Sequence, residues 1–236
     1  MSTGWSTDNT SPGRAEGTSH TPAGPIKAVF FDFGGVFINS PFAAAAAAAE
    51  TMGIPEAQLL ELVFGPYDVD GDHPWHRLER GEMSFSDAND AIAELAEAGG
   101  HGKIQPMDVL MALGANPGVR EFMVDLVRDL RGRGLATGII TNNIAEFGTA
   151  WRAMIPVDEL FDDIVDSSSV GVRKPDPAIY RLACERLEVD PGSAIFIDDH
   201  AGNVAGARSV GINGVWCGYS VESTKAAVEE LLAHLD

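Results

Sequence analysis

The sequence predicts a doubly wound α/β fold, with a parallel sheet and a helical cap inserted after the first strand. From residue 26 onward, short apolar runs of strand length alternate with helical patterns. This alternation is typical of parallel sheets with right-handed crossovers. The stretch 54–114 has no strand signal and interrupts the alternation. We therefore expect an α/β core of residues 26–40 and 115–236, and a helical cap of residues 41–114.

The first 25 residues form a polar tail. They are rich in Ser, Thr, Gly and Pro and contain almost no aliphatic side chain. Such a segment cannot bury enough apolar surface to offset its ordering entropy. We expect residues 1–25 to be disordered.

The first strand and its turn occupy residues 26–38, where the apolar run Ala-Val-Phe-Phe ends in Asp32 and two glycines. A continuous apolar run is typical of a strand that is buried on both faces. Helical signals follow: an alanine run stopped by Gly53, a leucine cluster, a segment capped by Ser84 or Ser86, and a segment starting at a proline. The expected helices are 41–52, one around 59–63, 84–98 and 106–113.

The remaining pattern alternates between the two element types. Apolar residues recur at helical spacing between runs of strand length. The expected strands are 135–141, 164–165, 194–197 and 214–216. The expected helices are 119–130, 144–154, 177–187, 204–210 and 221–235.

Composition limits the classes of partner. The net charge of −19 and the lack of a basic stripe argue against nucleic-acid binding. No apolar run reaches the length of about 18 residues that a membrane-spanning helix needs. The two cysteines, Cys184 and Cys217, belong to no zinc-binding pattern, and we expect both in the core. The N-terminus has no basic-then-apolar signal peptide, so a cytoplasmic protein is expected.

Polar residues follow several of the expected strands. The first strand ends at Asp32, the second at Thr141-Asn142-Asn143, and the fourth at Asp198-Asp199, while Lys174 follows the third in an Arg-Lys-Pro loop. The carboxyl ends of parallel strands lie along one edge of a sheet, which is where open α/β sheets bind ligands. We therefore expect these side chains to converge in one crevice.

Three neighbouring carboxylates repel one another unless a cation lies among them. Carboxylate oxygens with waters suit Mg²⁺. A phosphoryl group would fit the remaining space, with its charge neutralised by the metal and Lys174 and its oxygens held by Thr141 and backbone N–H groups. Asp32 would then attack phosphorus and form an aspartyl-phosphate that water hydrolyses.

Over residues 26–236 the chain resembles the haloacid dehalogenase-like hydrolase superfamily. The matching motifs are Phe-Phe-Asp-Phe-Gly-Gly-Val, Ile-Ile-Thr-Asn-Asn, Arg-Lys-Pro-Asp-Pro and Phe-Ile-Asp-Asp-His-Ala-Gly-Asn. The segment 75–82 is similar to a loop of the family's helical cap. The branch that it resembles includes the N-terminal phosphatase domain of soluble epoxide hydrolase.

The resemblance implies a role for each matching residue. Asp32 would be the nucleophile and a metal ligand, and the backbone carbonyl of Gly34 would be a second ligand. Asp199 is the first choice for the remaining ligand, with Asp198 supporting it and Asn203 ordering the loop. Thr141 and Asn142 would bind the phosphoryl group, and Lys174 would pair with Asp32 and the phosphoryl oxygens.

Gly34 departs from the family pattern. Phosphatases of this type carry an aspartate there that protonates the leaving group and then activates water, and glycine can do neither. General acid–base catalysis is typically worth about 10²- to 10⁴-fold. The consequence is a slow enzyme, a preference for a good leaving group, or a proton supplied by the cap. His73, His76 and Glu79 are candidates for that last role, and the sequence does not rank them.

The sequence thus predicts a Mg²⁺-dependent phosphatase acting on a small phosphorylated metabolite. A catalytically weakened binding or regulatory protein is the alternative that Gly34 supports. A 2-haloacid dehalogenase is a further alternative, disfavoured because such enzymes work without metal and carry a bulky tyrosine where this chain has Gly34. Neither the particular ester nor the oligomeric state follows from the sequence.

Overall fold

The computed structural model describes residues 24–102, 104–111 and 118–235. The expectation of disorder for residues 1–25 therefore lies almost wholly outside the described residues. The same is true of the last two residues of the helix expected at 106–113. No helix in the described part of the chain has the length and apolar character needed to cross a membrane.

Five parallel strands form one sheet in the order β3-β2-β1-β4-β5. Their bounds are β1 Ala28–Phe31, β2 Ala136–Thr141, β3 Asp163–Asp166, β4 Ala194–Asp198 and β5 Asn213–Trp216. The strand order reverses around β1, which pairs with β2 on one side and with β4 on the other. The predicted parallel α/β fold is confirmed.

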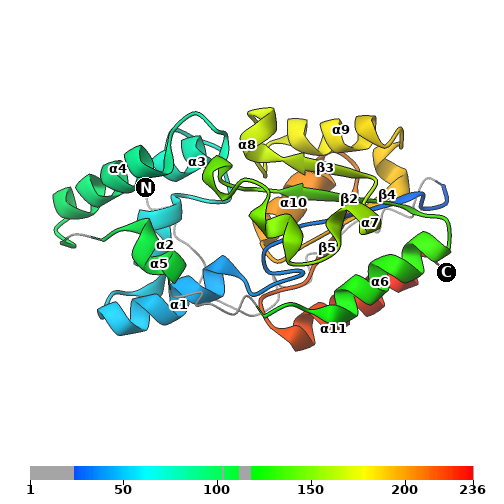
Figure 1. The fold of residues 1–236 in the computed structure, drawn as a ribbon, viewed down its shortest axis with the longest axis horizontal. Helices are drawn as coiled ribbons and strands as arrows, with labels where there is room; N and C mark the ends of the chain where they lie inside the picture. Colours follow the sequence, from blue (N-terminus) through cyan, green and yellow to red (C-terminus); the bar gives the residue numbers. More distant parts are fainter. Residues whose placement is uncertain (1–23, 103, 112–117, 236) are drawn as a thin grey trace.

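Both faces of the sheet are covered by helices (Figure 1). Successive strand residues point to opposite faces. Phe31 therefore packs in one apolar cluster with α6 (Glu121–Gly132) and α11 (Val221–Ala233), whereas Phe30 packs in another with α9 (Pro177–Arg186) and α10 (Ala201–Ser209). Cys184 and Cys217 lie in these two clusters as buried free thiols, as expected.

Most helices lie where the sequence predicts them. Their bounds are α1 Pro41–Met52, α2 Glu56–Phe64, α3 Pro74–Glu79, α4 Phe85–Ala98, α5 Pro106–Met111, α6 Glu121–Gly132, α7 Val157–Leu160, α8 Ser167–Val170, α9 Pro177–Arg186, α10 Ala201–Ser209 and α11 Val221–Ala233. Capping explains several starts. The hydroxyl of Ser40 accepts from Phe42 N at α1, and that of Ser84, one of the two expected caps, accepts from Asp87 N at α4.

The helix expected at 144–154 is absent as a continuous element. The segment forms two short 3₁₀ turns, η1 (Ala145–Phe147) and η2 (Ala150–Ala153). Gly148 separates them with a φ of 52°, a conformation that ends a right-handed helix. The sequence also misses α3, α7 and α8, which have four to six residues and show little of a helical period. The equally short α5 was predicted, in part from the proline at its start.

Helices α1 to α5, here called the helical insert (residues 41–111), lie together on one side of the sheet (Figure 1). They have an apolar cluster of their own, which includes Leu59, Val63, Trp75 and Ile92. Ile144, from the loop after β2, joins this cluster, so the insert packs directly over the carboxyl end of the sheet. This contact places the insert above the strand ends that carry the predicted site.

Candidate active site

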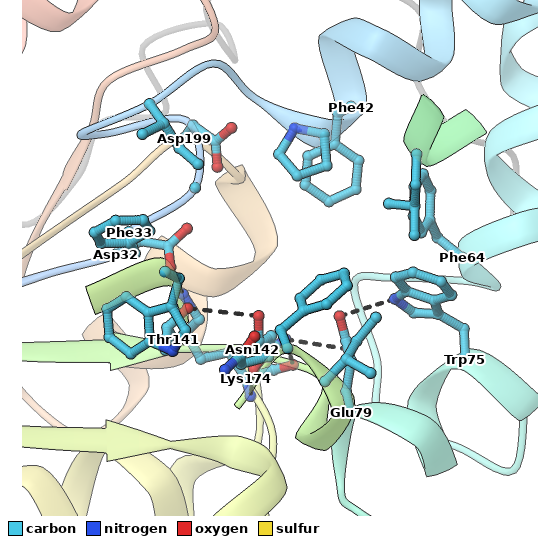
Figure 2. Close-up of a pocket in the computed structure, with 18 of the residues that line it drawn as sticks. Asp32, Phe33, Phe42, Phe64, Trp75, Glu79, Thr141, Asn142, Lys174 and Asp199 are labelled. Carbon is cyan, nitrogen blue, oxygen red and sulfur yellow. Dashed lines mark hydrogen bonds and ion pairs between the residues drawn. The ribbon is translucent and has the colours of Figure 1, made fainter. Parts of the chain in front are cut away.

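The carboxyl ends of β1, β2 and β4 bring the predicted polar residues together (Figure 2). Asp32 follows β1 directly, Thr141 is the last residue of β2, and Asp198 is the last residue of β4. Asp32, Thr141, Asn142, Lys174 and Asp199 line one cavity. The crevice expected from the sequence therefore exists in the structure.

Lys174 lies between two carboxylates. Its Nζ is 2.8 Å from Asp32 Oδ1 and 2.7 Å from Asp198 Oδ2. Burial opposes the charge of Lys174, but attraction to Asp198 and Asp32 outweighs it and raises the lysine pKa. Lys174 is therefore a fixed cation at the floor of the site.

The carboxyl group of Asp32 has a raised pKa. Burial raises the pKa of Asp32 from 3.8 to about 7; the charge of Lys174 opposes this shift and that of Asp198 adds to it. A pKa that is shifted by desolvation and by a specific charged neighbour in a cavity is characteristic of active-site residues.

Asp198 and Asp199 differ in what their oxygens do. Asp198 accepts from Lys174 Nζ, from the backbone N–H of His200 at 2.7 Å, and from Asn203 Nδ2 at 3.1 and 3.2 Å. In contrast, Oδ2 of Asp199 is buried without a hydrogen-bond partner among the described residues. Burial, followed by the charges of Asp198 and Asp32, raises the pKa of Asp199 well above its ordinary value. Asp198 is thus occupied as an anchor, while Asp199 has an oxygen to offer.

Gly34 and Gly35 differ in whether a larger residue would fit at their position. Gly35 has a φ of 74°, and a Cβ on it would lie 1.9 Å from Asp199 Oδ2. At Gly34 the nearest atom to a Cβ is Pro41 Cδ at 3.4 Å, which is an ordinary contact. Gly35 therefore leaves the room that Asp199 occupies, whereas Gly34 has space for a side chain.

A buried arginine holds this turn in place. Arg120 donates from its guanidinium to the carbonyl of Gly35, to Tyr219 O at 3.1 Å and to Thr224 Oγ1 at 2.8 Å. The turn after β1 is thereby tied to the segment that leads into α11. No motif in the sequence pointed to Arg120.

Asn142, which we expect to bind a phosphoryl group, makes several hydrogen bonds within the protein. Its Nδ2 donates to Tyr67 Oη at 3.0 Å and to Lys174 O at 3.1 Å, and its Oδ1 accepts from Lys174 N at 2.8 Å. The amide thus positions the Lys174 loop. Thr141 remains at the cavity wall with a buried side chain.

Glu79 is the centre of a buried network that joins the insert to the core. Its carboxylate lies 2.7 Å from Arg173 Nε and accepts from Tyr67 Oη and Trp75 Nε1 at 2.8 Å each. The Arg173 guanidinium also lies over the Tyr67 ring, 4.5 Å from its centroid. The sequence named Glu79 as a proton-donor candidate, but it missed Tyr67 and the partnership with Arg173. The Arg-Lys-Pro motif was the available signal for Arg173, and nothing in the sequence marked Tyr67.

The other two proton-donor candidates lie away from the cavity lining. Burial lowers the pKa of His73 to about 4 and that of His76 to about 3, with the Arg173 charge contributing at both. Both imidazoles are neutral at pH 7 and therefore carry no spare proton to donate. Of the three candidates only Glu79 reaches the cavity, where Arg173 already binds it.

The cavity has a volume of about 660 Å³ and extends from the carboxylates into the insert. Phe42, Phe64 and Trp75 of the insert lie on the side opposite Asp32 and Asp199 (Figure 2). Phe33 and Trp151 line it from the core. A polar floor thus opens into an apolar chamber.

The donor set fits a hard divalent cation. One oxygen each from Asp32, Asp198 and Asp199 can be chosen within 4.8 Å of one another. The unpartnered Oδ2 of Asp199 occupies the space that a side chain at position 35 would need. Oxygen-only ligands of this number suit Mg²⁺, which keeps several waters.

Several curated proteins are similar to parts of this chain. It is 28% identical to acyl-CoA dehydrogenase family member 10 of Mus musculus over 92% of the chain, but over 20% of that protein. It is 25% identical to bifunctional epoxide hydrolase 2 of Mus musculus over 87% of the chain and 38% of that protein. The chain therefore spans well under half the length of these two relatives. A sesquiterpene phosphatase of Aspergillus oryzae is 30% identical over 60% of the chain and 82% of its own length.

Solved structures share the fold. A haloacid dehalogenase family enzyme from Bacteroides thetaiotaomicron, in complex with magnesium and inorganic phosphate, superposes with a TM-score of 0.58 at 22% identity, over 83% of this chain and 96% of that one. The L-2-haloacid dehalogenase RSc1362 gives 0.62 at 20% identity, over 89% and 100%. The sequence pattern of haloacid dehalogenase-like hydrolases matches residues 26–211. Because this pattern covers most of the chain and its four motifs meet at one edge of the sheet, the chain belongs to the haloacid dehalogenase-like hydrolases.

Proposed function

We propose that the protein is a Mg²⁺-dependent phosphatase that acts on a small phosphomonoester through an aspartyl-phosphate on Asp32. The observation that carries the proposal is the placement of Lys174 between Asp32 and Asp198, beside the unpartnered oxygen of Asp199. This arrangement supplies a nucleophile, a cation and a metal ligand at the floor of one cavity. The phosphatases among the relatives support the same reading.

Asp32, Asp199 and the backbone carbonyl of Gly34 would hold the metal. Asp198 would support them, since its oxygens are engaged by Lys174, His200 N–H and Asn203. When bound, Mg²⁺ would neutralise part of the charge on the carboxylates and the phosphoryl group.

In the first step a carboxylate oxygen of Asp32 attacks phosphorus. The bond from phosphorus to the ester oxygen breaks, and the leaving group takes the electron pair. Lys174 Nζ and Thr141 Oγ1 stabilise the charge on the phosphoryl oxygens, together with backbone N–H groups of the loop after Asp32. In the second step water attacks phosphorus, and the bond to Asp32 breaks with its electron pair returning to the carboxylate. The proton that the water loses passes through solvent to the anion of the leaving group.

Gly34 leaves the leaving group without a side-chain proton donor from the turn after β1. Glu79 cannot replace it easily, because Arg173 and two further donors hold its carboxylate. The enzyme would therefore depend on how well the leaving group carries negative charge. We treat the helical insert as the cap that closes over the cavity and excludes water from it.

A 2-haloacid would bring a carboxylate into this cavity. Among the described lining residues Lys174 is the only cationic side chain, and it already pairs with Asp32 and Asp198. A phosphoryl group would have a metal as its second cation, whereas haloacid dehalogenases work without metal. The cluster of Asp32, Asp198 and Asp199 therefore favours the phosphatase, even though haloacid dehalogenases are among the relatives.

The test is phosphate release from sugar phosphates, nucleotides, acetyl phosphate and an activated aryl phosphate, with Mg²⁺ and with chelator. Release that chelator abolishes is the expected result. Folded protein that releases no phosphate from any of them would contradict the proposal and favour a binding or regulatory role. Halide release from a 2-haloacid in the presence of chelator would identify a dehalogenase instead.

A further inference from the structure

We propose that the substrate is an aryl phosphate: a phosphate monoester of an uncharged aromatic alcohol. The inference rests on the proposed phosphatase function and specifies its substrate class. Three independent features of the structure carry it: the aromatic chamber, the charge distribution around it, and the glycine at position 34.

The lining and the volume of the cavity, about 660 Å³, suit an aromatic ring. On the insert side the Phe64 and Trp75 rings meet edge-on with centroids 4.9 Å apart, and Phe42 meets Phe64 in the same way at 5.4 Å. On the core side Phe33 and Trp151 meet edge-on at 4.7 Å. The side chains of both walls are held by their neighbours and largely buried, so the chamber is formed before a ligand enters.

The rim of the cavity is apolar as well. Met107 of the insert, and Phe147 and Met154 of the core, line the cavity while remaining 42%, 46% and 42% exposed. Large apolar side chains that gather at the mouth of a pocket indicate a surface that a ligand covers. A hydrophilic sugar or nucleotide would leave them in contact with polar groups.

The charges around the chamber disfavour a second anionic group on the substrate. Lys174 is the only cation that lines the cavity in the described part of the chain, and both of its neighbours are carboxylates. Beyond the floor the lining carries Glu146, and also Glu79, whose charge Arg173 already balances. A carboxylate or a second phosphate on the leaving group would be desolvated in this chamber without a counter-ion.

Gly34 favours the same class on chemical grounds. Without an acid at this position the leaving oxygen must depart carrying most of its negative charge. A phenol has a pKa of about 10, close to that of the tyrosine side chain, so a phenolate leaves without full protonation. An aliphatic alkoxide is far more basic and depends more strongly on a proton donor.

The first experiment compares three esters of similar size with Mg²⁺: phenyl phosphate, 4-carboxyphenyl phosphate and cyclohexyl phosphate. We expect kcat/KM for phenyl phosphate to exceed that for its carboxylated analogue by about tenfold or more, chiefly through KM, because the extra charge is unpaired. We expect phenyl phosphate to be hydrolysed with a higher kcat than cyclohexyl phosphate. Equal kcat/KM for the charged and uncharged aryl esters would overturn the proposal.

A charge placed on the rim tests whether this chamber sets the preference. Met154→Lys puts an ammonium at the mouth, where the native side chain is exposed, and should shift the ratio of the two aryl esters toward the carboxylated one. Leu95→Lys is the matched control, because Leu95 is 45% exposed and lies outside the cavity lining. A ratio that changes equally in both variants, or in neither, would contradict the assignment of the chamber.

Two further measurements separate failure of this inference from failure of the phosphatase proposal. Chelator-sensitive release from acetyl phosphate without a preference for uncharged aryl esters would overturn the aryl class and leave the phosphatase standing. If no ester is hydrolysed, calorimetric binding with Mg²⁺ still tests the chamber, and phenylphosphonate should bind about tenfold or more tightly than methylphosphonate. Equal binding of the two phosphonates would overturn the inference.

Discussion

The ammonium nitrogen of Lys174 lies 2.8 Å from the carboxylate of Asp32, with both side chains at the floor of the cavity. The pair does two things at once. It orients the carboxylate toward the cavity, and it places a positive charge where the oxygens of a phosphoryl group would come. Substitutions in this pair, or in the residues around it, should therefore change both the reaction and the stability of the protein.

Asp32→Asn should reduce phosphate release by at least about 10³-fold, because the amide cannot act as the nucleophile. The fold should be retained with equal or greater thermal stability, since the variant removes a buried carboxyl group whose pKa is raised to about 7. Phosphate assays with matched circular dichroism melts check both parts. Turnover close to that of the parent protein would contradict the role of Asp32.

Gly34→Asp should raise kcat on alkyl phosphates by up to about 10²-fold, by restoring an acid next to the leaving group. The position has room, since a Cβ would contact only Pro41 within 4 Å. Gly35→Asp is the control: with a φ of 74° and a Cβ 1.9 Å from Asp199 Oδ2, it should lose activity and stability. No gain for Gly34→Asp on any alkyl ester would show that leaving-group protonation does not limit the enzyme.

Glu79→Gln should destabilise the protein by about 3 kcal/mol, because it leaves the buried Arg173 guanidinium without its nearest counter-ion. Glu82→Gln removes an ion pair to Arg80 in which the glutamate side chain is 45% exposed, and should cost less than about 1 kcal/mol. Denaturant unfolding measures the two changes. A large loss of kcat for Glu79→Gln with unchanged stability would instead identify Glu79 as the proton donor.

Mg²⁺ should stabilise the protein more at pH 8 than at pH 5. Burial raises the pKa of both Asp32 and Asp199, so between about pH 4 and 7 the metal-free folded state binds more protons than the unfolded state, and its stability falls as the pH rises. A bound cation stabilises the ionised carboxylates and so offsets this loss. At a hundredfold excess of Mg²⁺ over Kd the free energy of unfolding rises by about 2.7 kcal/mol. Each kcal/mol corresponds to about 2–4 °C in Tm for a chain of this size.

The control for metal binding is Asp199→Asn, which removes the carboxylate whose Oδ2 is unpartnered. Differential scanning calorimetry at the two pH values, with Mg²⁺ or chelator, makes the comparison. Equal stabilisation of parent and Asp199→Asn by Mg²⁺ would place the metal elsewhere.

The parts of the site that the sequence predicts are those set by the sheet. Thr141 and Asp198 end parallel strands and Asp32 directly follows one, so apolar runs that alternate with helical patterns were enough to place all three at one edge of a sheet. The parts that it misses depend on packing between distant segments. Tyr67 and Arg173 meet Glu79 only because the insert folds back over the sheet, and no local pattern encodes that contact.

The segment after β2 shows the same limit. Residues 144–154 have apolar spacing that predicts a helix, yet Ile144 packs into the insert and Trp151 into the core cluster, with Gly148 turning the chain between them. Tertiary contacts therefore override the local helical preference and produce two short turns at the mouth of the cavity.

The most direct test of the central claim is mass spectrometry of the peptide that contains Asp32, after acid quenching during turnover of an aryl phosphate with Mg²⁺. The lack of a carboxylate at Gly34 should slow the attack of water, so the phosphorylated peptide should accumulate in the parent protein and be absent from Asp32→Asn. Phosphate release by the parent protein with no phosphorylated peptide at any quench time, or with the phosphoryl group on another residue, would contradict the account.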